Sequence, residues 1–351
     1  MKLTDEAYKS TAFGKATTAI TIDYSKAFDL VDHSTLKNKL KELGIRNKLL
    51  KLIFSFLSNR KHYTKINGIK SKLAHITCGV PQGTISGPRL FTILIKGVKN
   101  PNVLNVKFVD DKTLAYSYSG DATHFLQNVL NIENSETIKD KMVINEAKCN
   151  IINFNFSSKN SPPQKLTLNN NEIVSVDRIK LLGVTITNEL RWRENTAEIV
   201  KKVNRKFYQL CKLKQFGVKQ EERLATWKTL IRPITEYAAP LWHNGLLEVD
   251  SRKLENLQRK AFGLIFGTVY IDYKRYYRIK NQPVPYELVL NMYDLPSLAE
   301  RRNELCIKFA HNTYENPRHK DFFKELPSSR PKTRSKQKVQ EQFCPTFKYQ
   351  R

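Results

Sequence analysis

Asn105–Tyr118 reads NVKFVDDKTLAYSY and places two adjacent aspartates between two segments of alternating apolar character. This alternation is typical of half-buried strands, so Asp110 and Asp111 are predicted at the tip of a hairpin. Two carboxylates about 4 Å apart repel by about 1 kcal/mol in water and by several times more near a protein surface. The tip therefore favours a cation such as Mg²⁺, although adjacent aspartates in a turn are also commonly solvated.

A third aspartate follows a second alternating segment, Ala19–Tyr24, which reads AITIDY. Ile20 and Ile22 share one face of the predicted strand, and Asp23 lies on the opposite face. On that face Asp23 can meet the Asp110 hairpin. Three carboxylates on one sheet face predict a site for two metal ions.

Composition indicates a polyanionic partner. The 351 residues contain 60 Lys and Arg against 33 Asp and Glu, a formal net charge of +27, and 40% are hydrophobic. That length allows two or three domains with buried cores, and the charge favours nucleic acid over a membrane. No apolar run approaches the length of a spanning helix and the N-terminus lacks a signal-peptide core, so we expect an intracellular protein. The five cysteines are widely spaced, which indicates reduced thiols rather than disulfides or a zinc site.

The segment after Asp23 predicts two helices and a hairpin, whereas residues 1–18 show little pattern. The first helix begins near Ser34 as N-cap and buries Leu36, Leu40 and Leu43, and the second covers Asn47–Leu57. Arg60–Cys78 predicts a hairpin turning at Asn67-Gly68. Its basic residues either follow a phosphate backbone or form a solvated surface.

Gly79–Pro88 reads GVPQGTISGP and lies between the two aspartate-bearing segments. Three glycines and two prolines exclude a regular element, and helical spacing returns over Arg89–Val98. A glycine-rich loop that leads into a helix brings backbone close to a ligand, as nucleotide sites require. Most such loops are simple turns, so the interpretation as a nucleotide site depends on the position of this loop between the two aspartate-bearing segments.

Further along the chain, strands give way to helices. We expect a helix over Asp121–Lys139, a strand within Met142–Phe156 with Lys148 near its start, a loop at 157–164 and strands over Leu166–Thr187 with a turn at Asn170-Asn171. Helices follow from Thr196, around 224–231, 251–265 and 296–314, and a flexible basic tail covers 328–340. The helix from Thr196 has one apolar stripe and a basic face suited to a nucleic-acid backbone: Lys201, Lys202, Arg205, Lys206, Lys212 and Lys214.

Together these motifs resemble the reverse transcriptases of non-LTR (LINE-like, Jockey/CR1-like) retrotransposons. The resemblance rests on AITIDYSKAFDLVDH, GVPQGTISGP and FVDD, in the family's order and spacing. Weaker similarity continues through INEAKCN, LLGVTIT and YAAPLW. The constellation covers residues 19–267 and is far more specific than any one motif.

The resemblance implies an α+β right-hand polymerase, with a palm of antiparallel sheet and packed helices, a helical thumb, and fingers that are largely missing. Its implied boundaries are 1–18 for a residual N-terminal segment, 19–156 for the palm with partial fingers, 157–190 for the primer grip, 191–270 for the thumb and 271–351 for a basic extension with a partly disordered tail. It also implies an RNA-directed DNA polymerase, a nucleotidyltransferase that uses an RNA template, a DNA primer and deoxynucleoside triphosphates, in the nucleus.

Residue roles follow from the same resemblance. Asp23 and Asp110 would hold two Mg²⁺ ions, with Mn²⁺ as an alternative, and Asp111 would assist. Phe28, with Ala27 beside it, would select deoxynucleotides. Gln82 and Gly83 would contact the incoming nucleotide and template, and Lys148 would protonate the pyrophosphate leaving group.

Two departures from the family pattern leave alternatives open. Phe108-Val109 replaces the usual Tyr-Ala before the aspartate pair, and almost nothing precedes Asp23, where the family carries its fingers motifs. The chain is therefore expected to be a truncated polymerase, or else an inactive remnant that binds nucleic acid through its thumb. A maturase or a viral RNA polymerase is a more distant alternative, and Phe28 argues against ribonucleotide use.

Overall fold

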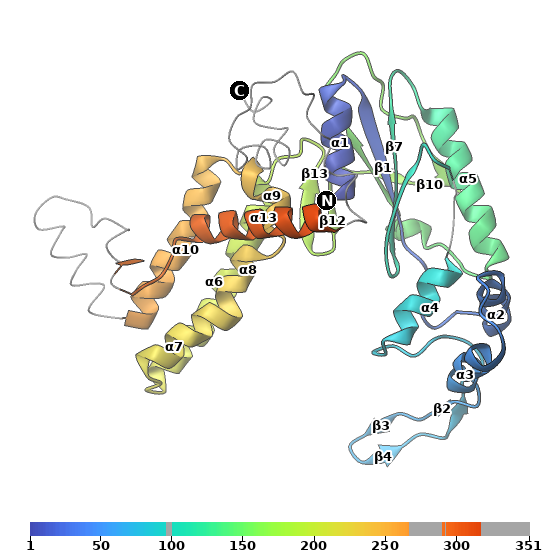
Figure 1. Ribbon diagram of the computed structural model, residues 1–351, viewed down its shortest axis with the longest axis horizontal. Coiled ribbons are helices and arrows are strands. Elements are labelled where there is room, and N and C mark those ends of the chain that lie inside the picture. The colour runs from blue at the N-terminus through green and yellow to red at the C-terminus, as the bar shows by residue number, and fades with distance from the viewer. Residues whose placement is uncertain (96–99, 267–289, 292, 317–351) are drawn as a thin grey trace, which may run out of the picture. The chain divides into compact units, whose positions relative to one another are not determined.

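A computed structural model describes residues 1–95, 100–266, 290–291 and 293–316 (Figure 1). The expected basic tail and most of the expected C-terminal extension lie outside the described residues. The chain forms two compact units, residues 1–182 and 183–351. Within the described ranges, no helix is both long and apolar enough to span a bilayer.

The first unit is built on a five-stranded sheet with strand order β11-β8-β1-β7-β6. β1 lies in the middle and pairs antiparallel with β7 on one side and β8 on the other. β6 and β7 form the predicted hairpin, in which Phe108 pairs with Asp111. The sheet strands are β1 (Ala16–Ile22), β6 (Leu104–Phe108), β7 (Asp111–Tyr118), β8 (Asn150–Phe154) and β11 (Val174–Ser175).

Helices cover both faces of this sheet. On one face Ile20 and Leu114 pack with Leu126 and Leu130 of α5 (Thr123–Lys139) in a single apolar core. On the other face lies α1 (Lys2–Ala12), whose Ser10 hydroxyl donates a hydrogen bond to Ser117 Oγ at 2.6 Å. The sequence of residues 1–18 showed little pattern and did not predict this helix, because Thr4 and Ser10 are buried and interrupt its apolar pattern.

The segment between β1 and the glycine-rich loop forms the predicted helices with two corrections. α2 (His33–Glu42) is capped by Asp32, whose carboxylate accepts a hydrogen bond from the Thr35 amide at 2.8 Å, and not by Ser34. Leu43 lies past the end of α2 and is half exposed rather than buried. The hairpin turn at Asn67 and Gly68 is confirmed, with both residues at positive φ as a two-residue turn requires.

The remaining elements of the first unit frame the sheet. The turn expected at Asn170-Asn171 falls one residue earlier, because Leu168 pairs with Asn171. The elements are α3 (Asn47–Leu57), β2 (Lys61–His62), β3 (Lys65–Ile66), β4 (Ile69–Lys70), β5 (Ala74–His75), α4 (Ser86–Leu94), η1 (Glu146–Lys148), β9 (Thr167–Leu168), β10 (Asn171–Glu172) and β12 (Arg178–Leu181).

The second unit is mostly helical in its described part, as predicted, and begins with one strand. Its core contains a fully buried Arg302, whose guanidinium lies 5.8 Å from the ring centroid of Trp242 and donates to His243 Nδ1 and Ser251 Oγ, both at 3.3 Å. Its elements are β13 (Val184–Thr187), α6 (Arg193–Gln215), α7 (Gln220–Thr226), the π-helix η2 (Trp227–Ile231), α8 (Arg232–Glu236), α9 (Ala239–Trp242), η3 (His243–Gly245), α10 (Glu248–Phe266) and α13 (Leu298–Glu315).

Candidate active site

Sheet register brings the aspartates of the first unit together. Ile22, the last residue of β1, pairs with Lys112 of β7. Asp23 follows Ile22 and Asp111 precedes Lys112, so antiparallel pairing places these two residues at the same end of adjacent strands. Asp110 stands beside Asp111 in the turn of the β6–β7 hairpin.

The turn that carries Asp110 is strained. Val109 has a φ of 59°, in the left-handed region that β-branched residues rarely adopt. Such a residue costs about 1–3 kcal/mol and persists where the surrounding structure determines the backbone. Here the strain sits immediately before the aspartate pair, at the point where the hairpin reverses direction.

The three carboxylates interact electrostatically. Partial burial, followed by the charges of Asp110 and Asp23, raises the pKa of the Asp111 carboxyl above its ordinary value. Carboxylate oxygens are the donors that Mg²⁺ prefers, and a divalent cation would relieve this mutual repulsion.

A complete cage of protein ligands is not formed in advance. In the parts of the chain that the structure describes, no group of three or more His, Cys, Asp or Glu side chains is arranged to hold a metal ion. Magnesium sites commonly combine one or two carboxylates with substrate phosphates and water instead of using an all-protein cage. The donor chemistry of the three aspartates therefore fits a magnesium ion that shares its coordination with a phosphate ligand.

A buried charge network lies directly behind the aspartates. Lys112 of β7 forms an ion pair with Glu133 of α5, and both side chains are buried to within 1% exposure. Tyr24, the residue after Asp23, donates a hydrogen bond from its hydroxyl to Glu133 Oε1 at 3.1 Å. Burial raises the pKa of Tyr24 and lowers that of Lys112, the latter partly opposed by Glu133. The Glu133 carboxylate of α5 thus binds both Tyr24, which follows Asp23, and Lys112, which follows Asp111.

A cavity of about 310 Å³ opens beside Asp23 and Asp111. Lys148 lines it and places its Nζ 3.8 Å from Asp23 Oδ1, while its own side chain stays 67% exposed. Arg178 and Lys180 also line the cavity and were not singled out from the sequence. In the sequence, the spacing of two residues between Arg178 and Lys180 could have indicated this role, because it puts two cations on one face of a strand.

The glycine-rich loop is fastened to the segment that follows Asp23. The Gly79 amide donates to Val31 O and the Val80 amide donates to Phe28 O, both at 2.8 Å. A Cβ at Gly79 would lie 2.9 Å from Asp29 O, so only glycine allows this approach. Two motifs that are 50 residues apart in the chain therefore form one surface.

Of the expected nucleotide-binding residues, Phe28, Gln82 and Gly83 lie on this surface, whereas Lys148 lines the cavity beside Asp23. Phe28 is half-buried and stacks on Phe91 of α4, with ring centroids 5.2 Å apart, and Ala27 is buried. Gln82 is exposed and its Nε2 donates to Asp29 Oδ1 at 3.4 Å. Gly83 has a φ of +75°, which suits a turn that presents bare backbone.

The expected nucleic-acid-binding cations belong to the second unit. All of them lie on α6, whose Val203, Phe207 and Leu210 are buried. Five are exposed and Lys212 is half-buried, so the basic face of α6 is solvent-accessible in this unit: Lys201, Lys202, Arg205, Lys206, Lys212 and Lys214.

Comparison with known proteins accounts for this arrangement. Residues 2–186 match the protein family described as reverse transcriptase (RNA-dependent DNA polymerase). This match spans more than half of the chain and contains every residue of the carboxylate site and the glycine-rich loop. The chain belongs to the reverse transcriptase family. The resemblance inferred from the three motifs is confirmed, and the matched region also includes α1.

Individual relatives of this reverse transcriptase come from non-LTR retrotransposons. It is 28% identical over 190 residues to the RNA-directed DNA polymerase from mobile element jockey of Drosophila funebris, covering 51% of this chain and 20% of the relative. It is 23% identical over 260 residues to the probable RNA-directed DNA polymerase from transposon X-element of Drosophila melanogaster, covering 70% and 28%. The chain thus spans between a fifth and somewhat over a quarter of the length of these relatives.

Among solved structures, the chain is similar to telomerase from Candida albicans in complex with a TWJ fragment of telomeric RNA. The two are 14% identical with a TM-score of 0.42, over 91% of this chain and 53% of that chain. This likeness is too distant to carry an argument.

Proposed function

We propose that this reverse transcriptase chain carries the nucleotidyl-transfer centre of an RNA-directed DNA polymerase from a non-LTR retroelement. The observation that supports this most is the strand register that pairs Ile22 with Lys112 and so brings Asp23 to the Asp110-Asp111 turn. The substrates are deoxynucleoside triphosphates, an RNA template and a DNA primer. In this proposal residues 19–156 act as palm, 157–190 as primer grip and 191–270 as thumb, in a protein that works in the nucleus.

Asp23 and Asp110 hold two divalent ions in this proposal, with Asp111 beside them. When bound, Mg²⁺ or Mn²⁺ supplies activation of the primer 3′-hydroxyl and neutralisation of triphosphate charge. The protein contributes a rigid floor, because the ion pair of Lys112 with Glu133 and the hydrogen bond from Tyr24 fix the segments that carry the carboxylates.

Phe28 and the glycine-rich loop form the nucleotide surface. The ring of Phe28 is held by stacking on Phe91 and by the backbone bonds to the loop, so it cannot move away from a bulkier sugar. A rigid aromatic at this point excludes a ribose 2′-hydroxyl. Ala27, Gln82 and Gly83 shape the rest of the surface against the base pair that forms there.

Lys148 is suited to donate a proton to the leaving pyrophosphate. Its ammonium lies at the edge of the 310 Å³ cavity, close to Asp23 and largely in solvent, where an anionic leaving group would pass. A positioned lysine can act as general acid. The basic face of α6, by contrast, binds backbone phosphates and supplies affinity without sequence preference.

Primer extension on an RNA template with Mg²⁺ tests the proposal. Asp110→Asn removes one carboxylate charge and is expected to lower the rate by about a thousandfold or more, since each factor of ten corresponds to about 1.36 kcal/mol of barrier. Asp121→Asn is the matched control: Asp121 is exposed, and Asn can still cap the Thr123 amide. Equal extension by wild type and Asp110→Asn would refute the assignment.

Substrate choice is tested separately through Phe28. Phe28→Val should leave deoxynucleotide incorporation within about tenfold of wild type and raise ribonucleotide incorporation, because the ring no longer fills the space beside the sugar. Phe91→Leu, which removes the aromatic stacking partner of Phe28 but keeps Phe28 itself, should relax the preference less. An unchanged ratio of deoxynucleotide to ribonucleotide incorporation in Phe28→Val would remove Phe28 from this role.

A further inference from the structure

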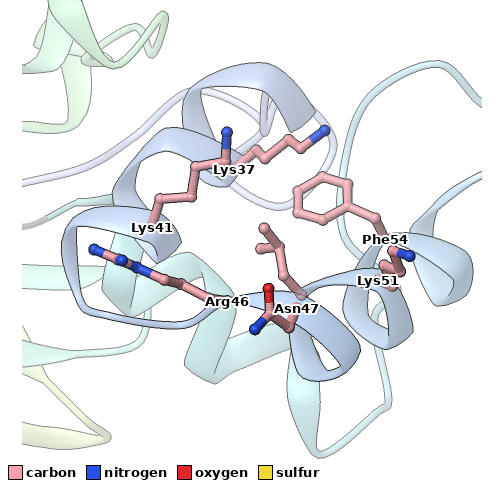
Figure 2. A pocket seen from close by; sticks show the side chains of 7 residues that line it. Lys37, Lys41, Arg46, Asn47, Lys51 and Phe54 are labelled. Carbon is pink, nitrogen blue, oxygen red and sulfur yellow. The ribbon is translucent and has the colours of Figure 1, made fainter.

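Helices α2 and α3 of the first unit and the connection between them line a second cavity, of about 580 Å³, which is open to solvent (Figure 2). We call it the α2–α3 cavity. It shares no lining residue with the cavity beside the aspartates. Its lining consists of four cations, one amide and two apolar side chains: Lys37, Lys41, Arg46, Lys51, Asn47, Leu50 and Phe54.

The cations of the α2–α3 cavity are available to a ligand. Among the residues that the structure describes, none of the four has a carboxylate within ion-pair distance. Lys39, on the same helix, shows the contrast: it turns inward and pairs with Asp140. No acidic residue lines the cavity, so its positive charge is not neutralised from within.

The floor of the cavity is apolar and held firmly. Leu50 and Phe54 are half-buried and pack against the main core of the unit. Lys37 reaches from α2 across to Phe54, with its Nζ 5.6 Å from the ring centroid, as Figure 2 shows. A cation held over an aromatic ring beside further cations favours a ligand that combines negative charge with a flat apolar group.

The local sequence produces this geometry. Leu36 and Leu40 are fully buried, and the residues that follow each of them, Lys37 and Lys41, lie one helical turn apart on the outer side of α2. The chain then reverses through Gly44, with a φ of +83°, before α3 begins. This short connection places Arg46 and Asn47 opposite the two lysines.

We propose that the α2–α3 cavity binds a single-stranded segment of nucleic acid, outside the polymerase centre. Its lysines and arginine contact successive phosphates, and one base lies on the floor formed by Phe54 and Leu50. Basic grooves with an aromatic platform bind single strands in this way, because every base offers a flat face. An acidic peptide would satisfy the cations and leave the aromatic floor unused.

Binding of a short fluorescein-labelled oligouridylate to the full chain in EDTA tests this inference, independently of catalysis. The variant Lys37→Gln/Lys41→Gln removes two cations of the cavity. Lys15→Gln/Lys48→Gln is the control with the same charge change, since Lys15 and Lys48 are exposed and line neither cavity. Phe54→Leu keeps an apolar side chain on the floor and removes the ring.

The cavity variant should bind about tenfold more weakly, and its plot of log affinity against log salt should be shallower by about 1.4, for two lost phosphate contacts at about 0.7 each. The control variant should stay within about twofold of wild type. Phe54→Leu should weaken binding about fivefold with an unchanged salt slope, because stacking releases no counterions.

Two results would overturn the inference. One is equal affinity and equal salt slope for the cavity variant and the control variant. The other is binding of poly-glutamate as tight as that of the oligouridylate, with the same loss in Lys37→Gln/Lys41→Gln, which would assign the cavity to acidic protein. Circular dichroism and thermal melting confirm that each variant is folded before its affinity is compared.

Discussion

Two lysines flank the aspartates of this reverse transcriptase, and they differ in burial and in the carboxylate that each contacts. Lys112 is fully buried on the sheet and pairs with an equally buried Glu133. Lys148 is 67% exposed and lies 3.8 Å from Asp23, at the mouth of a cavity. The buried side of the site, which we call the dry side, therefore holds a buried ion pair, whereas the solvent-exposed side, which we call the wet side, holds an exposed cation.

The two lysines therefore have different expected roles: Lys112 supports the fold, and Lys148 acts on the substrate. A buried ion pair adds little net stability, yet breaking it is costly because one charge is left without a partner in a dry environment. An exposed pair contributes little to stability but leaves the cation free to approach a substrate. We therefore expect changes at Lys112 and Glu133 to be seen first in folding, and changes at Lys148 to be seen in turnover.

The largest effect is expected on the dry side. Glu133→Gln leaves the Lys112 ammonium buried without a counter-charge and should destabilise the first unit by about 3–5 kcal/mol. The double variant Lys112→Met/Glu133→Gln should recover most of this loss, since it removes the unpaired charge and keeps an acceptor for the Tyr24 hydroxyl. Urea unfolding measures the free energy of unfolding of the single and double variants. A single variant as stable as wild type would show that the buried ion pair does not support the fold.

On the wet side the expected effect is kinetic. Lys148→Gln should lower the single-turnover rate of nucleotide addition by about a hundredfold, as expected when a general acid is lost. Its unfolding free energy should change by less than about 0.5 kcal/mol, because the side chain is mostly in solvent. The control is Lys159→Gln, an exposed lysine away from the cavity. A loss of stability with no loss of rate would reverse the assigned roles of the two lysines.

The protonation of Asp111 should have a smaller effect on folding stability, and the direction of this effect follows from its pKa. Its pKa is raised above the ordinary value of 3.8, so the protonated form favours folding, and that contribution is lost as pH rises through the raised pKa. At neutral pH without divalent ions, Asp111→Asn should therefore raise the thermal midpoint. The gain should vanish below about pH 4, where both proteins carry a neutral side chain. A gain of equal size at low pH would show that charge repulsion is not its cause.

The smallest effect on stability is expected at Val109, in the strained turn that carries Asp110. Val109→Gly removes a β-branched residue from the left-handed region, and it should raise the unfolding free energy by about 1 kcal/mol after allowance for the flexibility of glycine. Val109→Ala keeps a Cβ and should recover less. No change in either variant would mean that the turn relaxes without cost.

Much of this site could be predicted because its patterns are local. Alternation around Asp110 and Asp111 determines the hairpin, and Asn67-Gly68 determines the other turn. The three motifs also sufficed to identify the reverse transcriptase family, which the comparison confirms. The roles proposed for the individual residues of those motifs remain predictions.

The rest depended on packing that no local pattern reports. α1 was missed because it buries Thr4 and Ser10, which read as surface residues. The ion pair of Lys112 with Glu133 joins residues 21 apart, and it depends on how α5 lies across the sheet. Leu43 was assigned to the core by its spacing, but α2 ends at Glu42 and leaves it exposed.

Iron-dependent cleavage of the backbone tests directly whether Asp23 and the Asp110-Asp111 turn bind divalent ions together. Fe²⁺ in place of Mg²⁺, with ascorbate and peroxide, generates radicals that cut the chain close to a bound ion, and the fragments can be mapped by mass spectrometry. We expect cuts near both Asp23 and Asp110-Asp111, competed away by Mg²⁺ and lost in Asp110→Asn but not in Asp121→Asn. Cleavage near one of these segments without the other would contradict the claim that they hold divalent ions together.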